Sequence, residues 1–421
     1  MDNMSLFSIH RSTQANILAN AVNSLTDAKR KQETTKILEI LQTYILREID
    51  IENSIGLKNI VRRCKSLEDK ENIIGVAELL SIKNSLGIIY YYLGNDAVAK
   101  EILERNLDIN NESGETALIL THLGAIYRKL GQDYKGAAGY LEKAISIYDK
   151  TSSNSPRKAL ALTHLGNTYR TLGDFKKAGN ALKESVKIYH NTQGYYSGEA
   201  RALGYLGVVY REQSNLSDAK TLLEKSVDIY KKEQYPKYSA VYAGTLAHLG
   251  ITYRMLGEYD KAKEVLEESL AIYEQIRPKD HPDIGRNIQN LGVIYGEIGN
   301  YKKAEELLVK SVKDYEENYG VSHIETGKVL NHIGRFYTLS KNYNKSEESL
   351  NRAQEILESK NHPESYRSYE LFGDLYLKMQ KTKEDVILNY QKSLELALKY
   401  FDKGSTNVQR LKDKINALQN D

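Results

Sequence analysis

Four arginines recur at nearly equal intervals and are the side chains best suited to bind another molecule. Each directly follows a tyrosine, and the set is Arg128, Arg170, Arg211 and Arg254. A guanidinium offers a planar fork of donors and binds carboxylates through paired hydrogen bonds. The spacing predicts a basic stripe over residues 120–255. In the alternative interpretation each arginine pairs with a glutamate of a neighbouring repeat, such as Glu142, Glu184 or Glu224, and contributes only about 0–1 kcal/mol.

A second column lies six residues before the place of each arginine and consists mainly of imidazole and amide side chains. Its members are His122, His164, His248, Asn290 and His332, and Asn167 lies close to it. Such groups both donate and accept hydrogen bonds, as an extended peptide backbone requires. We do not expect a shared zinc site, because neighbouring helices pack about 8–10 Å apart, whereas zinc ligands lie about 2.1 Å from the metal. Arg201 and Arg286, near the starts of their helices, add charge.

Signatures of catalysis are missing from the sequence. There is no His-Glu-x-x-His and no Gly-x-Ser-x-Gly motif. The segment from Gly320 to Gly327-Lys328 has six intervening residues where a phosphate-binding loop has four, and Val329 stands where Ser or Thr would bind magnesium. The single cysteine, Cys64, excludes an internal disulfide framework, and we interpret it as an inert thiol. We therefore predict a non-catalytic protein without cofactor or bound metal.

These columns belong to a repeat that runs through most of the chain. An apolar residue followed by glycine precedes a tyrosine three residues after the glycine in eight places, six of them reading Leu-Gly. The eight glycines are Gly87, Gly124, Gly166, Gly207, Gly250, Gly292, Gly334 and Gly373. Repetition at such a fixed period is the sequence signature of a solenoid, in which each unit packs only on its neighbours. The chain is therefore predicted to be one array.

Each repeat reads as two amphipathic helices, as residues 158–190 illustrate. Apolar residues recur at helical spacing on both sides of Gly173-Asp174, where glycine suits a left-handed turn and aspartate can cap the next helix. Small residues recur where helices must cross closely: Ala178, Ala219, Ala262 and Ala304 at one place, and Ser185, Ser226, Ser269 and Ser311 at another. All five prolines fall between one repeat's second helix and the next repeat's first helix.

The pattern of Leu-Gly, tyrosine and two small residues resembles the tetratricopeptide repeat (TPR). The period near 42 residues, Asp280-His281-Pro282-Asp283 before one repeat and the tyrosines ending the second helices resemble the subtype of kinesin light chains and many bacterial proteins. The resemblance implies an all-α, right-handed superhelical solenoid of about eight helix pairs with helical caps. It also implies that the concave groove grips a peptide through the arginine, histidine and asparagine positions named above.

The predicted organisation has three parts. Residues 1–79 form a helical cap or degenerate repeat, with helices near 12–29, 33–49 and 53–66. Residues 80–400 form the array, and residues 401–421 form a capping helix over 406–419 that Ser405 can begin. The alternative for residues 1–79 is a separate helical module with its own partner. We expect no nucleic-acid partner there, because this segment balances 11 basic against 11 acidic residues.

Net charge, apolar runs and the N-terminal segment limit the classes of protein that this sequence can represent. The 421 residues carry a net charge of only +3, no apolar run approaches the roughly 20 residues of a membrane span, and no secretory signal is visible, so we expect a cytoplasmic protein. The sequence predicts a scaffold that captures a peptide segment or helix of a partner protein, with acidic or carboxylate character. The alternatives are a peptide-responsive regulatory sensor and the docking module of a bacterial effector.

Overall fold

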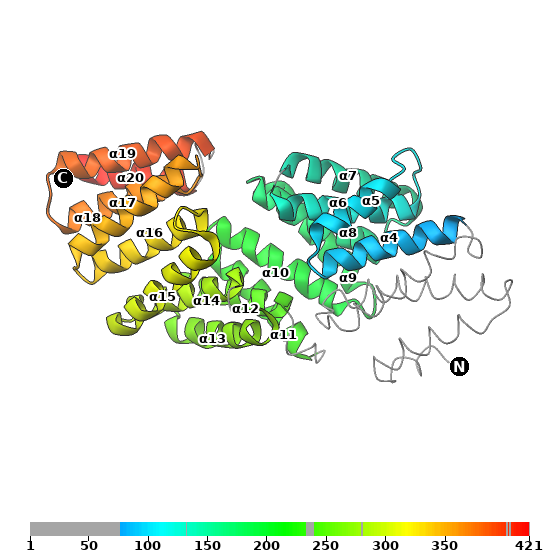
Figure 1. Ribbon diagram of the computed structural model, residues 1–421, viewed down its shortest axis with the longest axis horizontal. Helices are drawn as coiled ribbons and strands as arrows, with labels where there is room; N and C mark the ends of the chain where they lie inside the picture. The colour runs from blue at the N-terminus through cyan, green and yellow to red at the C-terminus, as the bar shows by residue number, and fades with distance from the viewer. Residues whose placement is uncertain are drawn as a thin grey trace. The chain divides into compact units, whose positions relative to one another are not determined.

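The computed structural model describes residues 76–131, 133–232, 240–278, 281–400, 403 and 406–420. Every regular element in these ranges is an α-helix, and the helices follow one another in pairs from α4 to α19, with α20 at the end (Figure 1). The all-α repeat architecture of eight helix pairs is thereby confirmed for the described part of the chain. The helices predicted over 12–29, 33–49 and 53–66 lie outside the described residues.

The helix bounds follow the repeat closely. They are α4 Val76–Tyr92, α5 Asp96–Asn106, α6 Gly114–Leu130, α7 Tyr134–Thr151, α8 Pro156–Thr171, α9 Phe175–His190, α10 Tyr196–Glu212, α11 Leu216–Lys232, α12 Ala240–Met255, α13 Tyr259–Ile276, α14 Pro282–Glu297, α15 Tyr301–Tyr319, α16 Ile324–Leu339, α17 Tyr343–Ser359, α18 Ser365–Lys378, α19 Lys383–Tyr400 and α20 Thr406–Asn420. The last is the helix expected over 406–419.

The chain divides into two compact units. The first unit comprises residues 1–210 and 221–241, and the second comprises residues 211–220 and 242–421. Within each unit the first helices of successive pairs contact one another: α4 with α6 and α6 with α8, then α14 with α16 and α16 with α18. We call the side on which these first helices meet the first-helix row. The second helices α5, α7, α15 and α17 each contact their own partner helix and the next first helix.

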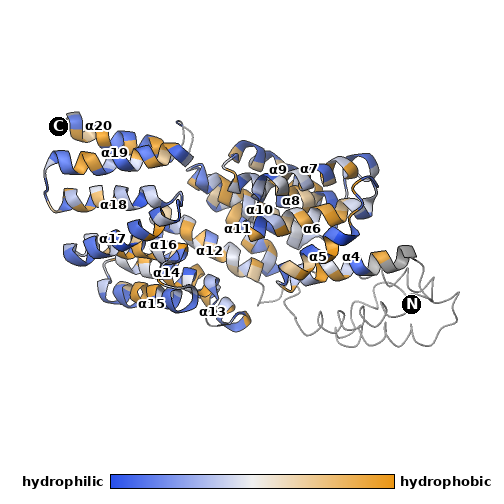
Figure 2. Ribbon diagram, turned by 45° about the horizontal axis from the view of Figure 1, so that its top comes forward, coloured by the Kyte–Doolittle hydropathy of each residue, from blue (hydrophilic) through white to orange (hydrophobic). Residues whose placement is uncertain are grey.

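The predicted helix boundaries have the expected capping chemistry. Asp174 accepts a hydrogen bond from the amide of Lys177 at 3.0 Å and so caps α9, and Gly173 has a φ of +79°, which confirms both predictions at this turn. Pro156 and Pro282 stand in the first turns of α8 and α14, where a missing N–H costs nothing. Figure 2 shows the resulting helices with hydrophobic and hydrophilic faces.

The small serines of the second helices do more than allow close packing. Four of them are fully buried, and each hydroxyl donates to a carbonyl of its partner helix 26 residues earlier. The pairs are Ser185 to Ala159 (2.8 Å), Ser226 to Ala200 (2.6 Å), Ser269 to Ala243 (2.7 Å) and Ser311 to Gly285 (3.3 Å). The serine position therefore also ties the two helices of a pair together.

Replacing Ser269 with alanine is expected to lower the free energy of unfolding by about 1 kcal/mol, the usual net value of an internal hydrogen bond. Ser349 is the matched control, because it is also buried on a second helix but donates within its own helix, to Lys345 at 2.7 Å. Ser349→Ala should change stability little. Urea denaturation followed by circular dichroism measures both, and equal losses would show that the bond between helices contributes nothing.

The repeat tyrosines join neighbouring pairs through their hydroxyl groups. Five of the eight donate to a glutamate on the second helix of the preceding pair: Tyr127 to Glu104, Tyr169 to Glu142, Tyr295 to Glu267, Tyr337 to Glu305 and Tyr376 to Glu347. Lysines lie over several of the same rings, such as Lys100 at 4.4 Å from the centre of the Tyr127 ring. The tyrosine position thus combines packing with a polar link between repeats.

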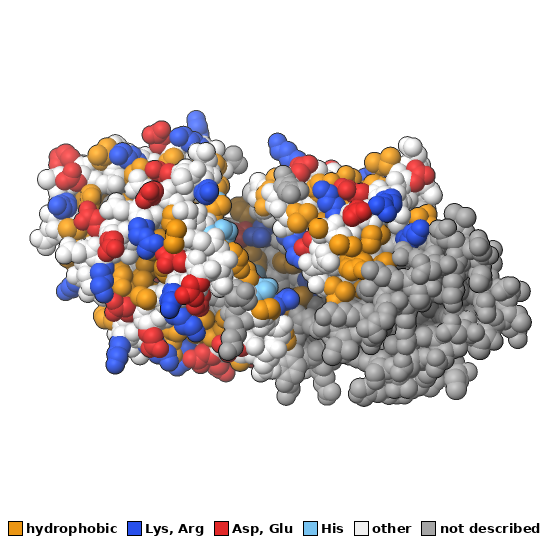
Figure 3. All heavy atoms as spheres, viewed as in Figure 1, with side chains coloured by type: hydrophobic (Ala, Val, Ile, Leu, Met, Phe, Trp, Pro, Cys, Tyr) orange, Lys and Arg blue, Asp and Glu red, His pale blue; other side chains and the backbone are white. Residues whose placement is uncertain are grey.

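Neither charge dominates the face of the described residues that Figure 3 shows. Figure 3 shows basic and acidic side chains interspersed over the visible described surface, in keeping with the small net charge. Within the described residues, no helix is both long and apolar enough to cross a membrane.

Candidate partner-binding surface

Three first helices of the first unit bring aromatic and imidazole rings together on the first-helix row. Tyr91 of α4 meets His122 of α6 edge to face at 5.8 Å between ring centres, and it meets His164 of α8 at 6.5 Å. Burial raises the pKa of Tyr91. Tyr91 stands four residues after Gly87, which is the place that arginine fills in the next four repeats.

His122 is fully buried, and both of its ring nitrogens have partners. Nδ1 lies 2.9 Å from the carbonyl oxygen of Leu118, so this nitrogen must carry the proton, and Nε2 then accepts from the hydroxyl of Tyr92 at 3.3 Å. Burial lowers the pKa of His122 to about 4. This imidazole is therefore neutral at physiological pH.

His164 has the same place on α8 but lacks such partners. Its side chain is 5% exposed, and neither ring nitrogen has a hydrogen-bond partner within the described structure. Burial and then the positive charge of Arg128 lower its pKa well below the usual value. The Nε atom of Arg128 is likewise buried without a partner in this part of the chain. A buried polar group left unpaired is unfavourable by about 1–3 kcal/mol, so a ligand that pairs with these atoms would gain that energy.

Two other predicted arginines, Arg170 and Arg211, form hydrogen bonds within the protein. Arg170 donates from Nε to Oδ1 of the buried Asn167 at 3.0 Å, which brings two predicted residues together on α8. Arg211, which belongs to the second unit, donates from Nη1 to the carbonyl oxygen of His248 at 3.2 Å. Arg170 and Arg211 thus each commit at least one donor to an internal bond.

Two of the three glutamates named as alternative partners are engaged elsewhere. Glu142 accepts from Tyr169, and Glu184 accepts from Lys158 at 2.7 Å. The side chain of Arg128 forms no hydrogen bond or ion pair within the described structure. Among the four predicted arginines, Arg254 of the second unit approaches a glutamate, Glu297, to 4.0 Å.

Glu297 on α14 lies between two arginines of the second unit. Its Oε1 atom is 2.8 Å from Nη2 of Arg335 on α16 and 4.0 Å from Nη1 of Arg254 on α12. His332, half-buried on α16, has its pKa lowered to about 3 by burial and by the charges of Arg367, Arg254 and Arg335. Asn290 is half-buried on α14.

Tyr91, Glu297, Arg335 and Arg367 were not singled out by the sequence. The basic residues of the first-helix row do not end at Arg254, because Arg335 and Arg367 continue them in other registers. Arg367 stands six residues before its repeat glycine, as Arg201 and Arg286 do, and Arg335 directly follows its glycine, as Asn167 does. A search of the sequence at these two positions of every repeat would have found Arg335 and Arg367.

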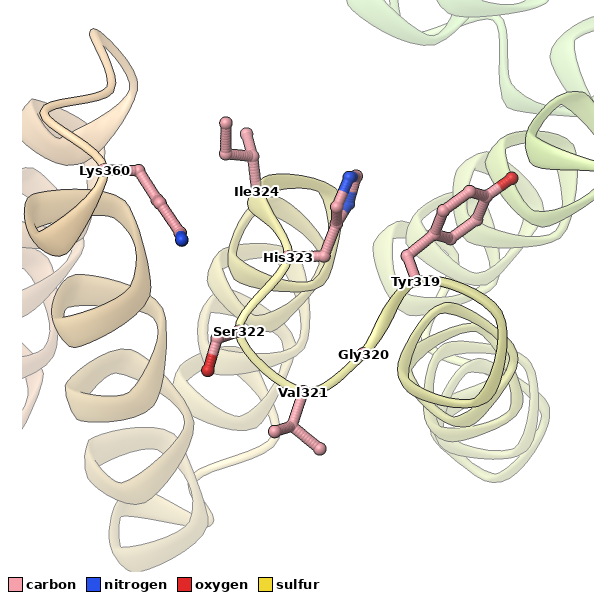
Figure 4. Close-up of a pocket in the computed structure, with 7 residues that line it drawn as sticks. All are labelled: Tyr319, Gly320, Val321, Ser322, His323, Ile324 and Lys360. Carbon is pink, nitrogen blue, oxygen red and sulfur yellow. The ribbon is translucent and has the colours of Figure 1, made fainter.

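A separate hollow lies away from these clusters, at the loop between α15 and α16. It has a volume of about 590 Å³, and Tyr319, Val321, His323 and Lys360 are among its lining residues. Figure 4 shows Lys360 reaching from the end of α17 toward the loop. The rings of Tyr319 and His323 stack with centres 5.0 Å apart. The described residues contain no group of three or more His, Cys, Asp or Glu side chains placed to hold a metal.

Comparison with solved structures places this architecture among known folds. A Rap protein complexed with Competence and Sporulation Factor is 16% identical and matches 92% of this chain and 99% of its own, with a TM-score of 0.58. The apo form of RapI is 15% identical and matches 70% of this chain and 99% of its own, with a TM-score of 0.54. A putative kinesin light chain from Podosopora anserina with nearly identical TPR-like repeats is 23% identical over 47% of this chain and 93% of its own, with a TM-score of 0.40.

No protein with a curated description matches the sequence significantly. The family profile described as tetratricopeptide repeat matches residues 78–150, 115–191, 157–232 and 242–317, which together are more than half of the chain. The eight helix pairs and the match to this profile agree on the same repeat. The chain therefore belongs to the tetratricopeptide repeat family, and its fold is that of a protein-interaction scaffold.

Proposed function

We propose that this protein captures a peptide segment of a partner protein on the first-helix row, through acidic groups and backbone amides of that peptide. The observation that carries the proposal is His164, which is buried and has two ring nitrogens without partners beside the guanidinium of Arg128. A neutral imidazole has one donor and one acceptor, which match the carbonyl and the N–H of an extended backbone. The arginine supplies a partner for a carboxylate.

Two further observations support a peptide ligand. Asn84 on α4 is 2% exposed, and neither its amide nitrogen nor its amide oxygen has a partner within the described structure. Asn84 stands three residues before its repeat glycine, on the helix that also carries Tyr91. A Rap protein of this fold has been solved complexed with Competence and Sporulation Factor, so the fold accommodates a bound factor. The cytoplasmic location expected from the sequence remains part of this proposal.

The proposal is tested by measuring how purified full-length protein binds to an array of acidic and neutral peptides. Arg128→Gln should weaken binding of acidic peptides about tenfold or more, because a charged hydrogen bond contributes about 1.5–3 kcal/mol. His164→Ala should weaken binding of acidic and neutral peptides alike, because it removes backbone contacts. Affinity capture from the native lysate, with the captured proteins identified by mass spectrometry, then names the partner.

Arg105→Gln provides the matched control in the first unit. Arg105 lies on the second helix α5, its side chain is 75% exposed, and it pairs with Glu101 at 2.8 Å. This control should bind like the wild type, and circular dichroism should show equal helicity for all variants. Acidic peptides that bind Arg128→Gln as tightly as the wild type would refute the assignment of the first-helix row.

A further inference from the structure

The second unit gathers three arginines around one imidazole. Arg254 comes from α12, Arg335 from α16 and Arg367 from α18, and these helices can be followed in Figure 1. Burial and these three positive charges lower the pKa of His332 to about 3, so its imidazole is neutral at physiological pH. We call Arg254, Arg335 and Arg367 the arginine cluster.

Carboxylates inside the protein neutralise the arginine cluster only in part. Glu297 contacts Arg335 at 2.8 Å and Arg254 at 4.0 Å through the same oxygen atom. Glu364 contacts Nε of Arg367 at 3.2 Å. Three guanidiniums thus face two paired carboxylates, and the neighbouring Glu370 is taken by Arg410 and Lys414.

Arg254 is the member with the least compensation. Its side chain is 22% exposed, and Glu297 approaches it only to 4.0 Å. Burial, followed by the charge of Arg335, lowers the pKa of Arg254 despite the attraction of Glu297. A guanidinium is rarely buried unless it is paired. Arg254 therefore retains donors for an anion from outside the protein.

We propose that the arginine cluster is a carboxylate-binding site for an acidic side chain of the partner peptide, and that Glu297 competes with that side chain from within. The inference rests on the proposed function, because the first-helix row must be the surface that the peptide meets. A single carboxylate matches the one unbalanced positive charge of the cluster. A phosphate dianion would bring two negative charges to a site that already holds Glu297, so the cluster favours a carboxylate.

The carboxylate of Glu297 determines which peptides the arginine cluster can bind. Glu297 holds Arg335 and partly holds Arg254 while no peptide is present, which lowers the repulsion between the two guanidiniums. An incoming carboxylate takes the remaining donors of Arg254 and competes for Arg335. A peptide without an acidic residue at this point leaves the internal pairs intact, so the site discriminates between peptides.

The test uses full-length protein and a fluorescein-labelled hexaglutamate peptide, with hexaglutamine as the neutral comparison. Anisotropy should show that Arg335→Gln or Arg254→Gln weakens hexaglutamate binding about tenfold. Glu297→Gln should strengthen it several-fold, because the competing carboxylate is gone. Inorganic phosphate should displace hexaglutamate only weakly from the wild type. Efficient displacement by phosphate would overturn the preference for carboxylate.

Arg352→Gln is the control for general charge effects. Arg352 lies on the second helix α17, pairs with Glu316 of α15 and is exposed to a similar degree as Arg335. It should bind hexaglutamate like the wild type. Weakening by Arg352→Gln equal to that by Arg335→Gln would show that binding follows net charge alone, and would overturn the site.

The outcome for Glu297→Gln separates this inference from the proposed function. If Arg128→Gln weakens binding while Arg335→Gln and Glu297→Gln leave it unchanged, the first-helix row still binds peptides but the arginine cluster is not a site. If Arg128→Gln, Arg335→Gln and Glu297→Gln all leave binding unchanged, both proposals fail. Loss of binding in Glu297→Gln would make Glu297 a contact for the peptide and would overturn its role as a competitor.

Discussion

Replacing Gly124 with alanine is expected to lower the free energy of unfolding by about 2–3 kcal/mol, because it overpacks the crossing of α6 and α7. A Cβ atom at Gly124 would lie 2.5 Å from Cγ of Leu141 and 2.9 Å from the carbonyl oxygen of Ala137. Leu141 is fully buried, and the carbonyl belongs to the backbone of the facing helix. Neither atom can yield without moving α6 away from α7.

Gly139→Ala in the same helix pair is the control with the opposite expected sign. Gly139 lies within α7 and is exposed, and a Cβ atom added there would have no neighbouring heavy atom within 4 Å. Alanine there removes the flexibility of a mid-helix glycine and should stabilise the protein by about 0.5–1 kcal/mol. Urea denaturation midpoints compare the two variants. A shift of both midpoints in the same direction would contradict the packing argument.

The same geometry explains why the repeat could be recognised in the sequence at all. Gly166, Gly250 and Gly334 are equally crowded, with an added Cβ lying 2.5–2.6 Å from the nearest atom of a leucine on the facing helix. Because these positions admit only glycine, glycine recurs there at nearly fixed intervals in the sequence, and the alanines that face it recur in the same way. The helix pairs, their boundaries and the cap at Asp174 were therefore predictable.

Features that depend on partners rather than on residue type were not predictable. The turn seven residues after each repeat glycine adopts a positive φ even where no glycine stands, at Ser214, Lys341 and Gln380. The tertiary structure imposes the left-handed conformation there against the local preference. Likewise, the small serines predicted close packing, but the sequence could not show which carbonyls their hydroxyls bind.

The candidate surface illustrates the same limit. Following one register along the repeats finds Arg254 but not Arg335 or Arg367, which stand at other positions of their helices. The members of the arginine cluster come from three helices and from three different positions of the repeat. Only the packed structure therefore brings them near His332. In the first unit, the sequence found His122 and His164 as equivalent residues. Their different hydrogen bonding depends on Tyr92, which no repeat pattern marks.

Acidification from pH 6.5 to pH 5 is expected to destabilise the protein through its buried histidines. In the unfolded chain histidine has a pKa near 6.5, whereas burial lowers the pKa of His122 to about 4 and that of His332 to about 3. Between these values the unfolded state binds protons that the folded state does not, so stability falls as the pH falls. For His122 the loss is up to about 2 kcal/mol at pH 5.

His332→Asn should make this decline shallower, because the variant removes one group that takes up a proton only on unfolding. Asparagine suits the position, since Asn290 fills it in the preceding repeat. Stability at pH 7.5 should therefore stay close to that of the wild type. His190→Asn is the control, because the His190 side chain is 67% exposed and the decline should persist. Urea midpoints at pH 7.5, 6.5, 5.5 and 5.0 measure the slope above the range in which most carboxylates titrate. A wild-type midpoint that is constant over this range would contradict the lowered pKa values of both histidines. An equally steep decline in His332→Asn would show that His332 is not held neutral by its half-buried place near Arg254, Arg335 and Arg367.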